Sequence, residues 1–162
     1  DFSVVVKWRL RALKMQKHQE VIKMIDRDCI FCKIAGGDIP SSTVYEDEQF
    51  RVLLDLSPAT KGHALILPKQ HYANIFEIDE NVLRDLIVLA KKVASAMKET
   101  LNCDGVNIVQ NNGEAAGQTV FHFHMHIIPR YKDDGQVIGW EPHTSDPEVQ
   151  AQLAEKIGQA IH

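Results

Sequence analysis

Apolar residues recur at helical spacing in one long stretch of the chain. Between Asp79 and Leu101 they stand three and four positions apart, at Val82, Leu83, Leu86, Ile87, Ala90, Val93, Ala94 and Met97. Asp79 is placed to cap the first turn, because its short side chain accepts hydrogen bonds from the free N–H groups there. This spacing predicts the main helix of the fold.

Short runs rich in β-branched and apolar residues lie on both sides of that stretch. They predict strands over residues 43–47, 50–55, 63–68, 105–110 and 120 to about 128, with Pro129 ending the last one. A polar, glycine-rich loop is expected over 111–117. Sequential strands with one long helix, and without strand–helix alternation, predict an α+β fold with a largely antiparallel sheet of about five strands.

A second helix is expected at the C-terminal end of the chain. Ser145 and Glu148 form a capping box, and Pro147 suits an early helical position. Val149, Leu153 and Ile157 then supply an apolar stripe. The predicted helix closes the chain.

Length and composition bound the class of protein. With 162 residues and 44% apolar content, the chain suits one domain over residues 29–162 after an extension, possibly non-native or disordered, over 1–28. No stretch approaches a membrane span or a signal peptide, so a cytoplasmic protein without a membrane partner is expected. Three cysteines fit a reducing compartment better than a disulfide framework.

Charge argues against a nucleic-acid partner. The net charge is −4, whereas such proteins need a basic face. Residues 1–28 carry seven Lys or Arg and four Asp or Glu, while residues 29–162 carry eleven and eighteen. The extension is therefore basic and the remaining chain acidic.

Three histidines alternate with apolar residues in the run Phe121-His122-Phe123-His124-Met125-His126. On a strand, His122, His124 and His126 would share one face, and the residues between them would face the core. Three readings follow: solvated polar residues, a catalytic zinc held by three histidines, or a nucleophilic imidazole that attacks phosphorus. The preceding loop, with Asn111, Gln118 and Thr119, offers neutral donors suited to a phosphate and favours the last reading.

At this point the sequence resembles the histidine-triad (HIT) hydrolases, in particular the bacterial Hit and Hint-type branch. The segment from Gly117 to Arg130 matches the His-x-His-x-His-x-x signature with apolar x. Further likeness lies in Cys29–Ile34, Ile39-Pro40, Asp55-Leu56-Ser57-Pro58, Gly62-His63 and Pro68-Lys69-Gln70-His71. The family implies cleavage at the α-phosphorus of purine nucleoside phosphoramidates or dinucleoside polyphosphates, through a nucleotidyl-histidine intermediate, by a homodimer.

The resemblance also implies a role for each matching residue. His124 corresponds to the nucleophile, and His126 and His63 to residues that contact the phosphate or orient the site. The nucleotide-binding residues implied are Asp55 and Leu56 at the ribose, Asn111, Gln118 and Thr119 at the phosphate, and Phe31, Ile34 and Leu53 as apolar walls around a purine base.

Cys29 and Cys32 have the spacing of a pair that can reach one metal ion, but a tetrahedral site needs two more ligands. The resemblance implies that these two further ligands are His71 and His122, and that each chain binds one structural zinc ion. A thioredoxin-like redox pair and two ordinary buried cysteines are alternative readings. The rival function from another class is an interaction module that binds nucleotides without catalysis.

Overall fold

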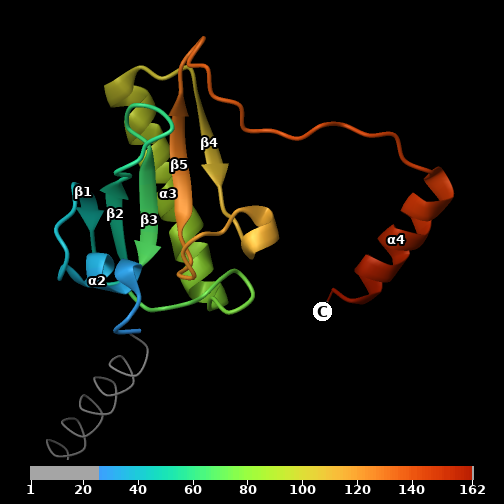
Figure 1. Cartoon of the computed structure of the whole chain (residues 1–162), viewed down its shortest axis with the longest axis horizontal. Coiled ribbons are helices and arrows are strands. Elements are labelled where there is room, and N and C mark those ends of the chain that lie inside the picture. Colours follow the sequence, from blue (N-terminus) through green and yellow to red (C-terminus); the bar gives the residue numbers. More distant parts are fainter. Residues whose placement is uncertain (1–25, 162) are drawn as a thin grey trace, which may run out of the picture.

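The computed structural model describes residues 26–161. Their centre is a five-stranded antiparallel sheet with the order β1-β2-β3-β5-β4 (Figure 1). The strands are β1 (Thr43–Glu46), β2 (Phe50–Leu54), β3 (Ala64–Pro68), β4 (Gly105–Val109) and β5 (Met125–Arg130). The predicted α+β fold with an antiparallel sheet is confirmed, whereas the expectation for residues 1–25 lies outside the described residues.

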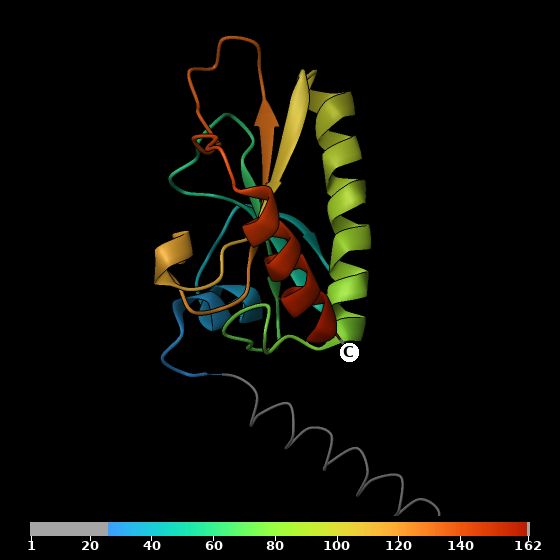
Figure 2. The same ribbon diagram turned by 90° about the vertical axis from the view of Figure 1, so that its right-hand side faces the viewer.

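Helices cover both faces of the sheet. The long helix α3 (Glu80–Leu101) lies along one face, and the short helix α2 (Ile30–Gly36) lies on the other (Figure 2). Side chains of β3 alternate between the two sides: Ile66 packs in the cluster beneath α3, and Leu65 and Leu67 pack in the cluster beneath α2. The central strand is therefore buried on both faces.

Both helices begin next to a residue whose side chain caps the first turn, and α2 ends at a glycine. Asp79 caps α3 by accepting hydrogen bonds from the N–H groups of Asn81 and Val82, as predicted. Helix α2 was not predicted. Its cap is Cys29, whose sulfur accepts from the Cys32 N–H, and Gly37 ends it with a φ of 91° that favours glycine.

The last strand differs from its prediction at both ends. It begins at Met125, not at Val120, so His122 and His124 precede the strand. Pairing with β3 stops at Ile66 opposite Met125; beyond it Pro68 has no N–H to donate, and its carbonyl accepts a hydrogen bond from the His122 ring. At the other end the strand continues through Pro129, where β4 is its paired neighbour.

The C-terminal helix α4 (Pro147–Gln159) is present, but its cap is Asp146, not Ser145. The Asp146 carboxylate accepts hydrogen bonds from the N–H groups of Glu148 and Val149 and so replaces the predicted capping box. An arm, residues 131–146, carries α4 away from the sheet past β4 (Figure 1). Among the described residues, no helix is both long and apolar enough to span a membrane.

Candidate active site

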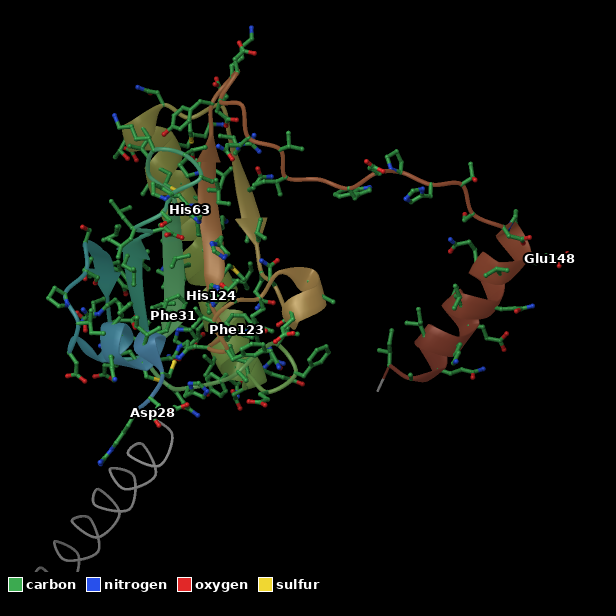
Figure 3. All side chains as sticks on the ribbon, viewed as in Figure 1. Asp28, Phe31, His63, Phe123, His124 and Glu148 are labelled. Atoms are coloured by element: carbon green, nitrogen blue, oxygen red, sulfur yellow. The ribbon has the colours of Figure 1, made fainter. Side chains whose placement is uncertain are left out.

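Four histidines from two parts of the chain meet on the α2 side of the sheet. His122 and His124 lie in the segment before β5, His126 lies in β5, and His63 directly precedes β3 (Figure 3). The predicted alternation holds around them, since Phe123, Met125 and Ile127 are in the core cluster under α3. Phe121 is the exception, because its side chain is 46% exposed.

Backbone contacts fix which nitrogen of His124 carries its proton. Its Nδ1 lies 2.6 Å from the carbonyl oxygen of His122, which can only accept a hydrogen bond. The neutral ring therefore carries its proton on Nδ1 and leaves a lone pair on Nε2. This is the arrangement that a nucleophilic imidazole requires.

A second chain of hydrogen bonds fixes the other two rings. The Ala59 N–H donates to Nδ1 of His63 at 3.0 Å, so Nε2 of His63 carries the proton. That nitrogen lies 2.9 Å from Nδ1 of His126, to which it donates. His126 in its neutral form consequently carries its own proton on Nε2, where it is free to donate to a ligand.

Burial keeps these rings neutral. Desolvation, reinforced by the neighbouring His124 and His63, lowers the pKa of His126 to about 4. Burial likewise lowers the pKa values of His124 and His63, against an opposing effect of the Asp55 carboxylate. The site therefore combines a buried lone-pair nitrogen with a neutral N–H donor.

Next to His124 lies an apolar wall. The Phe31 ring meets the His124 ring edge-on, with centroids 5.0 Å apart. Ile34 and Leu53 are buried in the cluster against which Phe31 packs. The three expected base-pocket residues are thus brought together beside the candidate nucleophile, by α2 and β2.

The two residues expected at the ribose lie at the end of β2. The Asp55 carboxylate is 3.7 Å from Nε2 of His63 and accepts a hydrogen bond from the Ser57 N–H at 2.8 Å. Leu56 is 91% exposed. Asp55 is therefore placed at the rim of the histidine cluster, and Leu56 projects into solvent beside it.

The expected phosphate loop contains a short 3₁₀ helix, η1 (Glu114–Ala116). Gln118 is buried, and its carboxamide donates to the carbonyls of Ala73 and Val120 and accepts from the Gly113 N–H. In this structure Gln118 organises the loop. Asn111 is half-buried and Thr119 is exposed, and the phosphate contacts of all three stay a prediction.

The four expected metal ligands form one cluster. Ligand atoms of Cys29, Cys32, His71 and His122 all lie within 4.8 Å of one another. Sulfur-to-nitrogen distances are 3.5 Å from Cys29 to His122, 3.3 Å from Cys32 to His71 and 3.4 Å from Cys32 to His122. Tetrahedral zinc would set these separations at about 3.5 Å, given its usual bond lengths.

The second nitrogen of His122 supports the same reading. Its Nε2 donates to the Pro68 carbonyl at 2.9 Å, which leaves the Nδ1 lone pair facing the sulfurs. Burial raises the pKa of the Cys32 thiol to about 12, so a nearby cation is needed to hold it as a thiolate. The donor set and its spacing fit a structural zinc ion.

The alternative of one zinc on three triad histidines finds no matching geometry within residues 26–161. His122 belongs to the cysteine cluster, while His126 groups with Asp55 and His63 within 4.8 Å. In the second group His63 and His126 already share a hydrogen bond. His122 and His126 thus belong to two separate clusters.

Sequence reasoning missed the backbone groups that orient the rings. The Ala59 N–H and the carbonyls of Pro68 and His122 fix the ring tautomers. Backbone groups carry no residue-specific signal, so no sequence pattern could identify them. Pro58 directly precedes Ala59, and Pro68 is the last residue of β3, but neither proline signals a hydrogen bond to a histidine ring.

Comparisons with known proteins agree with this geometry. The model of the HIT domain matches residues 36–133. A protein named hit from Bacillus subtilis is 44% identical over 83% of this chain and 94% of its own length. Adenosine 5'-monophosphoramidase hnt1 from Schizosaccharomyces pombe is 40% identical over 82% of this chain and 98% of its own length.

Solved structures show the same fold. A HIT-family protein from Bacillus subtilis has a TM-score of 0.79 and 42% identity, covering 84% of this chain and 99% of that one. A zinc-bound histidine-triad protein from Mycobacterium smegmatis has a TM-score of 0.66 and 35% identity, covering 83% and 98%. From its sequence, its fold and its arrangement of histidines, the chain belongs to the HIT family.

Proposed function

We propose that the protein is a nucleotide hydrolase in which His124 forms a covalent bond to the α-phosphorus of its substrate. The observation that carries this proposal is the hydrogen bond from His124 Nδ1 to the His122 carbonyl, which leaves Nε2 as the lone-pair nitrogen. The adenosine 5'-monophosphoramidases among its relatives support the reaction class.

The proposed reaction has two steps. Nε2 of His124 attacks phosphorus, a bond from nitrogen to phosphorus forms, and the bond to the leaving amine or phosphate breaks. Water then attacks the same phosphorus and gives up a proton, the bond to His124 breaks, and a nucleoside monophosphate leaves. This proton balances the one that the leaving amine takes up in the first step. The N–H on Nε2 of His126 is available to donate to a phosphate oxygen in both steps.

The proposed substrates are purine nucleoside phosphoramidates or dinucleoside polyphosphates. Phe31, Ile34 and Leu53 form an apolar surface beside His124 that suits a planar base. Asp55 is placed to accept hydrogen bonds from ribose hydroxyls, and an ionised acceptor makes these bonds stronger. No step requires a metal at the reacting phosphorus.

Zinc, where bound, would be held by Cys29, Cys32, His71 and His122 and would have a structural role. It would join the start of α2 to the segment before β5 and so fix the ring of His122. The His122 carbonyl in turn orients His124. Zinc binding would thus influence catalysis through His122, although His124 itself is not a zinc ligand.

A homodimer joined through β4 completes the proposal. Strand β4 lies at one edge of the sheet, and Ile108 on it and Ile87 on α3 are exposed. Both line a hollow of about 410 Å³ between α3 and β4. A free edge with apolar side chains is suited to pairing with a second copy.

The test is turnover of a fluorogenic purine nucleoside phosphoramidate by purified protein. His124→Ala should lower kcat/KM at least about 10³-fold while AMP binding is retained, because only the nucleophile is lost. His143→Ala is the matched control, since His143 is exposed and remote from the site in sequence, and should retain full activity. Absence of turnover in the unaltered protein, with nucleotide binding intact, would instead favour a non-catalytic interaction module.

A further inference from the structure

Helix α4 carries an apolar stripe that nothing in the described chain covers. Val149, Leu153 and Ile157 are 52%, 47% and 60% exposed, and Ile161, just beyond the end of the helix, is 75% exposed. The three helical residues recur every four positions and so lie along one side of the helix. None of the residues of α4, all of them described, is buried.

The body of the protein has an apolar groove at the opposite end of the sheet from β4. Its volume is about 470 Å³, and it lies between α3 and the outer strands β1 and β2. Val44 and Leu54 line it from the strands, and Leu89, Val93 and Ala96 line it from α3. Within residues 26–161, no segment of the same chain fills this groove.

The arm leads α4 away from its own groove. Its root is held by Arg130, which pairs with both carboxylate oxygens of Asp134 at 2.7 and 2.8 Å and donates to the Gln136 carbonyl. Tyr131 donates to the Lys61 carbonyl. From this fixed root the arm passes the β4 edge (Figure 1), whereas the groove is lined by residues of α3 and of β1 and β2, at the other edge of the sheet.

A second copy joined at β4 would lie on the side toward which the arm runs. Reaching the groove of that copy means crossing β4 and then the partner's strands as far as β2, about 25 Å at the usual strand spacing. Beyond this fixed root, residues 137–146 can extend over about 33 Å. The arm is therefore long enough to span the junction and to place the helix on the partner.

Charge favours the same contact. Residues 133–161 contain six Asp or Glu and one Lys. The charged side chain among those lining the groove is Lys92, and it is exposed. An acidic arm and helix are thus attracted to a groove whose charge is positive.

We propose that α4 of each chain packs its apolar stripe into the groove between α3 and β1–β2 of a second copy of this chain. The exchange would be reciprocal in a two-fold dimer, so each chain clasps the other. This inference rests on the proposed homodimer, because pairing through β4 sets where the groove of the partner lies. It does not depend on the chemistry at His124.

Disulfide trapping in the full-length, zinc-loaded chain tests this inference. Leu153→Cys places a thiol in the stripe, and Ala96→Cys places one in the groove. With both changes in one chain, mild oxidation by glutathione disulfide should give covalent dimers on a non-reducing gel. The control replaces Leu153→Cys by Glu148→Cys, whose side chain lies roughly 140° around the helix and should give at least about tenfold less dimer.

The outcomes separate the helix contact from the dimer itself. Light scattering first gives the mass of the unaltered protein, and a monomer would overturn both the homodimer and the exchange. A dimer in which both engineered thiols stay free would overturn the exchange alone. Loss of both thiols at monomer mass would show that α4 folds back onto its own chain, which also contradicts the inference.

Discussion

His122, His124 and His126 are two residues apart in sequence, yet each ring is held by a different group. His122 donates to the Pro68 carbonyl and turns its other nitrogen toward the cysteines. His124 donates to the His122 carbonyl and keeps a lone pair on Nε2. His126 accepts from His63. The roles that we propose for the three histidines therefore follow from their hydrogen-bond partners.

The pH dependence of activity should reflect this buried, neutral set of rings. Burial and the neighbouring His124 and His63 lower the pKa of His126 to about 4, and Asp55 opposes the shift. Because the neutral form is then retained below the ordinary value of about 6.5, kcat/KM should stay level as pH falls through 6.5. A pH–rate profile of zinc-loaded protein checks this, and an acidic limb centred at 6.5 would contradict it.

The lowered pKa of His126 also makes the stability of the folded protein depend on pH. Between about 4 and 6.5 the unfolded chain binds a proton at this position that the folded protein does not. The free energy of unfolding should therefore decrease as pH falls through that range. Urea unfolding at several pH values measures it.

At the scale of elements, the cluster of two cysteines and two histidines joins α2 to the histidine segment. Cys29 and Cys32 lie at the start of α2, and His71 and His122 lie after β3 and before β5. A helix of seven residues has little stability of its own, so tertiary contacts must hold it. A bound zinc ion would supply a strong tertiary contact of this kind.

Cys29→Ser should therefore lower both the zinc content and the thermal stability. Loss of one of the ligands should reduce bound zinc well below one ion per chain and lower Tm by roughly 5–10 °C. Cys103→Ala is the control, because Cys103 is buried in the α3 cluster, and it should retain zinc. Metal analysis and calorimetry measure the two effects, and full zinc content in Cys29→Ser would exclude this site.

Periodicity identified the long helix and the sheet because both depend on apolar residues at regular spacing. It placed the start of β5 wrongly because the chain before Met125 is also apolar but bonds elsewhere, for example through Phe123 N–H to the Tyr72 carbonyl. It missed α2, whose cap is a cysteine. The spacing of Cys29 and Cys32 indicated a candidate metal-binding pair, but His71 and His122 were added only through family resemblance, because the fold brings residues far apart in sequence together.

In the whole molecule, the edge strand β4 and the outlying helix α4 are the two features on which the proposed dimer depends. Apolar spacing in the sequence predicts neither feature, because it identifies an apolar stripe on a helix but not the surface against which that stripe packs. The sequence predicted α4 with its apolar stripe, and the structure shows that this stripe is exposed. A helix whose partner is another chain has the same sequence pattern as one that packs on its own body.

Ile108→Asp should weaken the dimer if β4 forms the junction. Ile108 is 46% exposed on the edge strand, and a carboxylate at the proposed junction would remove apolar contact and place a charge there. The dimer dissociation constant should rise at least about tenfold, which sedimentation measures. Phe76→Asp, at a residue 86% exposed and outside the strands, should leave it unchanged; equal effects of both changes would argue against β4.

The proposed reaction requires that His124 becomes covalently bonded to the nucleotide. Rapid denaturation at neutral pH during turnover of an adenosine phosphoramidate, followed by peptide mass spectrometry, would detect this bond. We predict one nucleotidyl group on the peptide that contains His124, at His124 itself, and none in His124→Ala. An adduct on His126 or His63 instead, or turnover that continues in His124→Ala, would contradict the assignment.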